Sequence, residues 1–582
     1  MAPSRKAASK ADSSQVSSQS STEKFNKELK ELAAKAQNDT WGNNALQRLR
    51  RLLGAVAVLA LAAVFANVSQ LMLSPVYGGI PSGAWHSKIV MTGAFVGWAG
   101  NLAIQKTSPL KASRLLPLVA LFAPPIQFVL ERYSGVLGGI WGPAVTEMLT
   151  VFPILVISAA TVADAVEGVK VPLLPAFLAD AAPGMGSWAC FKAFETASSR
   201  YLGSVIGTTF MYTRMGMQLL LGGVYAVLAP SVYLLITIPA LVHTALYNTH
   251  LQLPQSTEML KTELLHHNWM LVDRQDSTTG YVSVLENLKD GYRVMRCDHS
   301  LLGGEYTANL GGAVAEPIYG VFAMLEAVRL VETPKPVADN DAKALVIGLG
   351  IGTTPSALVA HGINTTVVEI DAAVHRFARD YFDLRENNEP VIEDATVYTK
   401  QLASTEQRFD YIVHDVFTGG AEPISLFTLE FLGQLHTLLE PHGSIAINYA
   451  GDLHLPGPRT IVRTIKQVFP TCRIFREYPP DKDMIARTGS DFTNVVIFCS
   501  KQDASLTFRD ATTADMLGTY ARQEFLQPKY EVNAAEFLSS ADEVGILRAN
   551  DTDIVARAHK TSALGHWRIM RNVLPAVVWE RW

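Results

Sequence analysis

Charged residues are scarce in this 582-residue chain, and cysteines are scarcer still. Asp, Glu, Lys and Arg together make up 18% of the residues, whereas soluble domains carry about a quarter, which argues against an ordinary soluble enzyme. The four cysteines show neither CxxC nor zinc-ligand spacing, so we expect reduced, packed thiols and no metal site. A formal net charge of −5 gives no general attraction to nucleic acid, so we expect no such partner.

Charged side chains are absent altogether from residues 52–87, and they stay sparse up to about residue 250. A stretch of about 20 apolar residues is long enough to cross a bilayer as an α-helix. The apolar runs therefore predict a multi-spanning α-helical membrane domain over residues 52–250, with about six helices; five or seven also fit the pattern. The expected spans are residues 52–74, 89–105, 115–130, 143–163, 203–229 and 231–250.

Basic residues lie mainly on one side of these runs. Residues 1–51 form a basic tail, expected to be disordered, with ten Lys or Arg against five Asp or Glu, and the loop at 106–114 carries three basic residues. The positive-inside rule places both in the cytosol, and six spans would return the C-terminal domain there too. We expect a multi-pass protein in the lipid bilayer of the endoplasmic reticulum or plasma membrane. Glu147 and Arg214 form a candidate ion pair within the spans.

Beyond residue 251 charge returns, and strand-like segments alternate with helical ones. Residues 251–335 are predicted to be a β-hairpin subdomain followed by a linker helix. Residues 336–502 are predicted to be an α/β Rossmann-like domain of the S-adenosylmethionine-dependent methyltransferase type. Residues 503–582 are predicted to be a helical extension. Its last seventeen residues carry three Trp and three Arg, which suggests docking onto the core or the membrane interface.

A glycine turn follows a buried strand in the segment Ala-Leu-Val-Ile-Gly-Leu-Gly-Ile-Gly. Its three glycines are Gly348, Gly350 and Gly352. Residues without side chains let the backbone approach a ligand closely, and the helix that follows offers free N–H groups. Glu369 ends the next strand, where an acid can hold ribose hydroxyls. The turn lacks the third glycine of a dinucleotide fingerprint, and Asp394 and Asp415 follow later strands, so an S-adenosyl-type ligand is favoured over NAD.

Residues 270–500 resemble the spermidine/spermine synthase (polyamine aminopropyltransferase) family, in a membrane-anchored form similar to a fungal group. The motifs that carry the resemblance are the glycine turn, Glu369-Ile-Asp371, Glu393-Asp-Ala395 and the loop 415–423. The resemblance implies that Glu369 binds ribose, that Asp394 beside Ala395 binds the adenine amine, and that Asp415 is the first acid of the catalytic loop. The donor would be S-adenosylmethionine or its decarboxylated form.

Two positions depart from that family's pattern. Ile351 stands where the glycine motif has Asp, and Thr418 stands where the catalytic loop has its second Asp. Aminopropyl transfer needs a carboxylate that holds the amine and accepts its proton, which threonine cannot do. Asp415 or Glu422 would have to take that role, and His414 is a further candidate base, although a packed strand histidine is favoured.

The resemblance implies aminopropyl transfer to a small amine in polyamine biosynthesis. Methyl transfer from S-adenosylmethionine stays open, because ordinary S-adenosylmethionine carries its own carboxylate and depends less on the missing Asp. A repurposed or inactive nucleoside-binding protein, acting on a lipophilic metabolite, also stays open. A transporter is disfavoured because the apolar segments show no internal repeat. A homodimer is left open.

Overall fold

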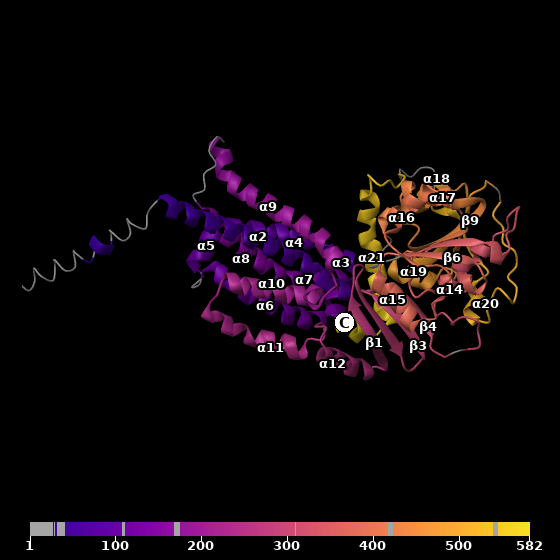
Figure 1. Cartoon of the computed structure of the whole chain (residues 1–582), viewed down its shortest axis with the longest axis horizontal. Coiled ribbons are helices and arrows are strands. Elements are labelled where there is room, and N and C mark those ends of the chain that lie inside the picture. Colours follow the sequence, from indigo (N-terminus) through magenta and orange to yellow (C-terminus); the bar gives the residue numbers. More distant parts are fainter. Residues whose placement is uncertain are drawn as a thin grey trace, which may run out of the picture.

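The computed structural model describes residues 27, 29–31, 41–107, 111–167, 175–308, 310–416, 423–503, 505–538 and 545–582. A helical half and an α/β half lie side by side, with helix α21 between them (Figure 1). The tail that we expected to be disordered lies mostly outside the described residues. That expectation is wrong for residues 41–51, because helix α2 begins at Trp41 and runs without a break into the first apolar run.

The helical half is built from the apolar runs of the sequence, and its core includes fully buried residues of α2 such as Phe65 and Met72. Its helices are α2 (Trp41–Tyr77), α3 (Gly79–Gly83), α4 (His86–Ala99), α5 (Asn101–Thr107), α6 (Ala112–Glu131), α7 (Ser134–Leu149), α8 (Val151–Val166), α9 (Ala176–Val205), α10 (Arg214–Leu228), α11 (Ile238–Tyr247) and α12 (Pro254–Leu265). Helix α9 lies between two expected spans and was not anticipated.

Three helical segments of the described chain are long and apolar enough to cross a membrane: Ala45–Tyr77, Ala112–Glu131 and Ser134–Val166. Two shorter apolar helical segments follow at Arg214–Leu228 and Val232–Tyr247. The expected run at 89–105 is divided between α4 and α5 at Gly100. The count of six spans stays a prediction.

A four-stranded antiparallel sheet opens the α/β half. Its strands, in spatial order, are β1 (Trp269–Asp276), β2 (Tyr281–Asn287), β3 (Tyr292–Cys297) and β4 (Ser300–Tyr306). The predicted hairpin is the β2–β3 pair, with Asn287 opposite Tyr292, and this expectation is confirmed. The sequence reading missed the two outer strands. The expected linker helix is short: α13 (Gly320–Leu325) continues into a 3-10 turn at Glu326–Leu330.

An eight-stranded sheet forms the centre of the α/β half, with strand order β12-β10-β11-β9-β8-β5-β6-β7. The strands are β5 (Lys343–Ile347), β6 (Asn364–Glu369), β7 (Val391–Ile392), β8 (Phe409–His414), β9 (Leu439–Gly451), β10 (Thr471–Arg476), β11 (Thr493–Ser500) and β12 (Tyr530–Val532). Strands β5 to β9 pair in parallel, and β11 pairs antiparallel with both β9 and β10. The predicted α/β architecture is confirmed.

Helices connect the strands of this sheet and cover it. They are α14 (Thr353–Ala360), α15 (Ala372–Tyr381), α16 (Ala395–Ala403), α17 (Leu429–Leu438), α18 (Pro456–Val468), α19 (Lys482–Thr488) and α20 (Tyr520–Phe525). Because parallel strands need crossover connections, their carboxyl ends collect at one edge of the sheet. This edge faces β4 and the C-terminal helices, as the cavity described below shows.

The C-terminal segment ends in α21 (Asp553–Val573) and α22 (Ala576–Glu580), and its three tryptophans are buried. The indole N–H of Trp567 donates to the carbonyl of Val76 in α2 at 3.1 Å. The ring of Trp582 stacks on His250 at a centroid distance of 4.3 Å. The predicted docking of this segment is confirmed, and its place is the junction between the two halves.

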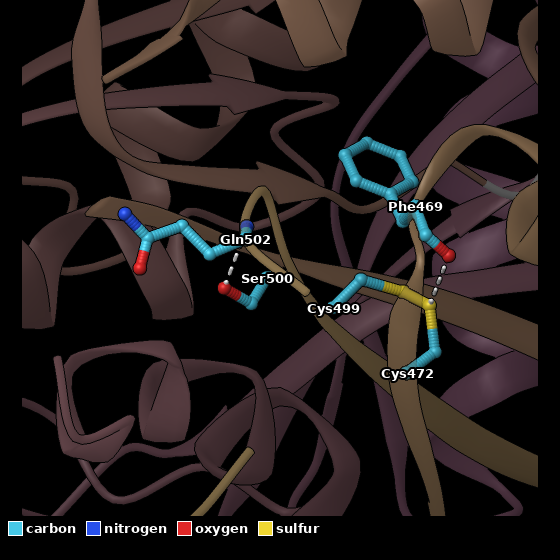
Figure 2. Close-up of a disulfide and its surroundings, with 5 residues drawn as sticks. All are labelled: Phe469, Cys472, Cys499, Ser500 and Gln502. Atoms are coloured by element: carbon cyan, nitrogen blue, oxygen red, sulfur yellow. Dashed lines mark hydrogen bonds between the residues drawn. A yellow bond between two sulfur atoms is a disulfide. The ribbon is translucent and has the colours of Figure 1, made fainter. Parts of the chain in front are cut away.

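A disulfide joins Cys472 on β10 to Cys499 on β11, which lie opposite each other in the antiparallel ladder (Figure 2). The expectation of reduced thiols is wrong for this pair. It holds for Cys190 and Cys297, which are free. The two bonded cysteines are 27 residues apart in sequence and meet only because the strands pair.

Candidate functional site

A cavity of about 740 Å³ opens at the carboxyl edge of the parallel strands. Its walls include the β3–β4 region of the small sheet, the start of α13, the turns after β5 to β8, the ends of β9 and β10 with the start of β11, and one face of α21. The predicted site residues found in its lining are Gly348, Gly350, Glu369, Asp394, Ala395 and Asp415.

The glycine turn lies between β4 and β8 with no room for side chains. A Cβ on Gly348 would lie 2.0 Å from the carbonyl oxygen of Asp415, and one on Gly350 would lie 2.4 Å from that of Leu302. Both glycines have positive φ angles, of 85° and 56°. Gly352, with a φ of 88°, instead forms the N-cap of α14. The turn therefore presents bare backbone to the cavity, as close binding of a nucleoside requires.

Glu369 is fixed by backbone donors at the end of β6. Its Oε2 accepts from the N–H of Leu349 at 3.0 Å, and its Oε1 accepts from the N–H of Asp371 at 2.9 Å. The side chain is 8% exposed, and burial raises its pKa from 4.5 to about 7. Each carboxylate oxygen keeps a further lone pair that can accept from a ribose hydroxyl.

Asp394 caps helix α16. Its Oδ1 accepts from the N–H and the hydroxyl of Thr396 at 2.8 and 2.7 Å. Ala395 begins the helix beside it, and Glu393 also borders the cavity. These residues follow β7, next to β6, so they extend the wall that Glu369 begins.

Asp415 follows β8 in the middle of the sheet edge. Its Oδ1 accepts a hydrogen bond from the side-chain amide of Asn448 on β9 at 2.8 Å. Asp415 lines the cavity, and burial raises the pKa of its carboxyl group from 3.8 to about 6. Thr418 and Glu422, the other two candidate positions of the catalytic loop, lie outside the described residues.

His414 is a packed strand residue. It is fully buried, and its Nε2 lies 2.9 Å from the carbonyl oxygen of Leu426. Burial lowers its pKa to about 4. The prediction that His414 is a packed strand residue is therefore confirmed.

The comparisons with known proteins agree with a transferase of this type. The spermine/spermidine synthase domain family matches residues 324–481. An N-terminal histidine N-methyltransferase of Emericella nidulans is 46% identical over 554 residues, which cover 92% of this chain and 98% of that protein. The chain belongs to the N-terminal histidine N-methyltransferase family.

More distant similarities are to a polyamine aminopropyltransferase and to a probable spermidine synthase. A polyamine aminopropyltransferase of Vibrio vulnificus is 28% identical over 198 residues, which are 33% of this chain and 60% of that protein. A probable spermidine synthase from Corynebacterium glutamicum, known from its crystal structure, is 17% identical with a TM-score of 0.36 and covers 48% of this chain and 95% of that one. The expected S-adenosyl-type donor is confirmed as a class, and the glycine turn and Glu369 fit such a molecule.

In this member of the N-terminal histidine N-methyltransferase family, the cavity has a second set of walls that the sequence reading missed. Arg476 at the end of β10 donates two hydrogen bonds to Asp491, at 2.8 and 2.9 Å. Phe492 follows Asp491, and α21 contributes His566 and Met570 to the lining. The tail had been interpreted as a docking segment only. The sequence of the tail carries no signal that would have placed its face at this cavity.

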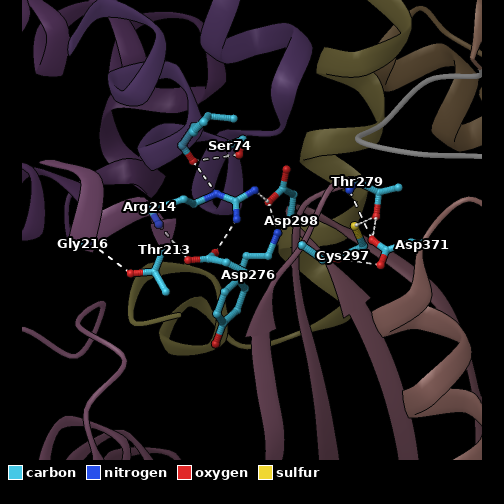
Figure 3. A network of polar contacts seen from close by, with 12 residues as sticks. Ser74, Thr213, Arg214, Gly216, Asp276, Thr279, Cys297, Asp298 and Asp371 are labelled. Atoms are coloured by element: carbon cyan, nitrogen blue, oxygen red, sulfur yellow. Dashed lines mark hydrogen bonds and ion pairs between the residues drawn. The ribbon is translucent and has the colours of Figure 1, made fainter. Parts of the chain in front are cut away.

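Helix α10 of the helical half is connected to the segment that follows β6 through the loop between β1 and β2 (Figure 3). Arg214 pairs with Asp276 and lies 3.5 Å from Asp298. The hydroxyls of Ser277 and Thr279, in the same loop, donate to Asp371, which caps α15 two residues after Glu369. Because Asp276 and Ser277 are adjacent in the chain, the two groups of polar contacts together link the two halves of the protein.

The candidate pair of Glu147 with Arg214 is wrong. The Oε1 of Glu147 lies 2.6 Å from Nδ1 of His86, on α4. Arg214, at the start of α10, instead pairs with Asp276 at the end of β1, and its Nε donates to the carbonyl of Leu71 on α2 at 2.8 Å. Both polar groups do find buried partners, as polar side chains in an apolar bundle must.

Proposed function

We propose that this protein is a membrane-attached N-methyltransferase that transfers the methyl group of S-adenosylmethionine to a nitrogen of an N-terminal histidine. The observation that carries the proposal is the 46% identity to an N-terminal histidine N-methyltransferase over nearly the full length of both chains. The cavity supports it, because one wall suits an adenosyl donor and Asp415 lies beside the space where an acceptor would enter.

The reaction is a direct displacement. A lone pair of the acceptor nitrogen attacks the methyl carbon, the carbon–sulfur bond breaks, and S-adenosylhomocysteine leaves as a neutral thioether. The nitrogen must lose a proton to end uncharged, and Asp415 is placed to accept it. A carboxyl group with a pKa near 6 is ionised at neutral pH and still basic enough for this role. The protein otherwise contributes alignment of nucleophile and leaving group.

Aminopropyl transfer is the second candidate, because the spermine/spermidine synthase domain matches residues 324–481. The position of Ile351 disfavours it. That side chain is 3% exposed and packs against Gly303 of β4, so this part of the glycine turn offers an apolar contact where the polyamine family has an acid. A repurposed, inactive nucleoside-binding protein has less support, since Asp415 and Glu369 are both present at the cavity.

The proposal also covers the membrane attachment of the protein and the compartment that its α/β half faces. The three long apolar helices support attachment to a membrane. Disulfides persist in oxidising compartments and are rare in the cytosol, so the Cys472–Cys499 bond favours an α/β half that faces the endoplasmic reticulum lumen or the cell exterior. With a cytosolic N-terminus this needs an odd number of crossings, such as the five or seven that the apolar pattern also fits.

A donor comparison tests the reaction class. The full chain is incubated in detergent with S-adenosylmethionine plus a peptide that begins with histidine, and separately with decarboxylated S-adenosylmethionine plus putrescine. We expect S-adenosylhomocysteine in the first mixture and no methylthioadenosine in the second. Methylthioadenosine in the second mixture, without S-adenosylhomocysteine in the first, would establish the aminopropyl alternative.

A further inference from the structure

The sheet order divides the cavity into two regions on either side of Asp415. The turns after β5, β6 and β7 lie on one side of β8 and carry the glycines, Glu369 and Asp394. The ends of β9 and β10 and the start of β11 lie on the other side and carry Asn448, Arg476 and Phe492. Since the donor residues occupy the first region, the second region is the space left for the acceptor.

Helix α21 closes this second region. His566, Ile569 and Met570 line the cavity, and their spacing of three and four residues puts them on one face of the helix. The helix lies outside residues 324–481, the part of the chain that matches the spermine/spermidine synthase domain. This wall is therefore a feature that the shared domain does not itself supply.

A second face of α21 is attached to the helical half. Trp567 donates to the carbonyl of Val76, and Arg571 donates to the hydroxyl of Ser134 at 3.1 Å. Gly139 of α7 packs so closely that a Cβ there would lie 3.1 Å from the Trp567 ring. The position of the cavity-facing residues is thus set by contacts with the helical half.

The wall is chemically suited to a ring beside an amine. Phe492 and His566 are neighbours, with ring centroids 6.4 Å apart. Burial lowers the pKa of His566 to about 4, so its imidazole is uncharged at neutral pH and does not repel a cation. Asp491 is held by Arg476, and its oxygens keep lone pairs that can accept from an α-ammonium group.

We infer that Phe492, Ile569 and Met570 form the acceptor subsite, where the first residue of a polypeptide substrate packs while the nitrogen that receives the methyl group faces Asp415. These residues determine specificity by the shape of the space that α21 leaves open. The inference rests on the proposed function, since it assigns the acceptor of that reaction to this region. It adds that the C-terminal helix, anchored on the helical half, completes the acceptor site.

The test fills the acceptor subsite with larger side chains and leaves the glycine turn, Glu369 and Asp394 unchanged. Met570→Trp and Ile569→Trp are compared with Asn572→Trp, an exposed position on the same helix, in the full-length protein. The KM for a peptide that begins with histidine is measured together with the affinity for S-adenosylmethionine by calorimetry. We expect both filling variants to raise the KM for the peptide by roughly tenfold or more, which is the size of effect expected when an apolar group no longer fits its pocket. Their affinity for S-adenosylmethionine should be unchanged, and Asn572→Trp should behave like the wild type.

Two results would overturn the inference. One is an acceptor KM of both filling variants equal to that of Asn572→Trp. The other is a loss of donor affinity in both filling variants, since that would place the helix at the donor end. If the wild-type protein binds the donor but does not methylate the peptide, the proposed function is wrong, and the acceptor assignment that rests on it is wrong as well. The assay of the wild-type protein shows that outcome before any variant is measured.

Discussion

The side-chain amide of Asn448 donates a hydrogen bond to Oδ1 of Asp415 at 2.8 Å, joining the ends of two adjacent parallel strands. The Oδ1 of Asn448 is buried and has no hydrogen-bond partner in the described part of the chain. The amide therefore orients the carboxyl group of Asp415. Asp415 is thus held in position at the point where the donor and acceptor regions of the cavity meet.

Asp415→Asn should abolish methyl transfer while leaving donor affinity near that of the wild type, because the amide cannot accept a proton. Burial raises the carboxyl pKa to about 6, so kcat/KM of the wild type should fall as the pH drops below about 6. A buried acid with a raised pKa favours the folded state at low pH and loses that contribution as the pH rises. Asp415→Asn should therefore raise the melting temperature at pH 8 relative to wild type, and much less at pH 4. Retained activity in this variant would remove Asp415 from the mechanism.

Glu369→Gln should weaken binding of S-adenosylmethionine, because a carboxylate accepts hydrogen bonds from ribose hydroxyls more strongly than an amide does. Since the pKa of Glu369 is about 7, wild-type donor affinity should be lower at pH 6 than at pH 8, and the variant should lose this dependence. Calorimetry at the two pH values measures both effects. Glu389→Gln, at an exposed position before β7, is the matched control. Equal affinities of Glu369→Gln and the control would contradict the ribose assignment.

Arg214→Met should lower the stability of the full chain, because it leaves Asp276 buried without its partner. Breaking a buried ion pair costs about 3–5 kcal/mol, whereas an exposed side chain contributes little. Thermal melting in detergent should show a large loss for this variant and almost none for the exposed Arg200→Met. Asp276→Asn combined with Arg214→Met should lose less than the sum of the two single changes. Simple additivity would show that the two residues do not interact.

The Cys472–Cys499 bond should be present in protein isolated from its own membranes without reductant. Alkylation before and after reduction, followed by mass spectrometry, should find these two thiols blocked and Cys190 and Cys297 free. Cys472→Ser should destabilise the fold by about 3–4 kcal/mol, the range for closing a loop of this length. Four free thiols in the unreduced protein would contradict both the bond and an oxidising location for the α/β half.

Local features of the site could be predicted from sequence. The glycine turn and Glu369 depend only on a strand, a tight turn and the end of the next strand, all within 25 residues or so of chain. The docking of the tail followed from the concentration of tryptophans, which are buried as expected. Ile351, where the polyamine family has Asp, was also the reason that the sequence left methyl transfer as an alternative to aminopropyl transfer.

Features that depend on how distant segments pack could not be predicted in the same way. Cys472 and Cys499 meet only through the pairing of β10 with β11. The rotation of α7 and α10 decides that Glu147 contacts His86 while Arg214 faces Asp276, and hydropathy carries no information about that rotation. The place of His566 in the cavity wall was missed for the same reason, because a helix pattern does not show which cavity its face will line.

The central claim is methyl transfer to the first residue of a histidine-initiated chain. The most direct test is fragment mass spectrometry of a peptide that begins with histidine after incubation with the full-length protein and S-adenosylmethionine. The account predicts one added methyl group located on residue one, and no addition to the same peptide extended by an N-terminal alanine. An unmodified histidine peptide, in a reaction where the protein binds the donor, would contradict it.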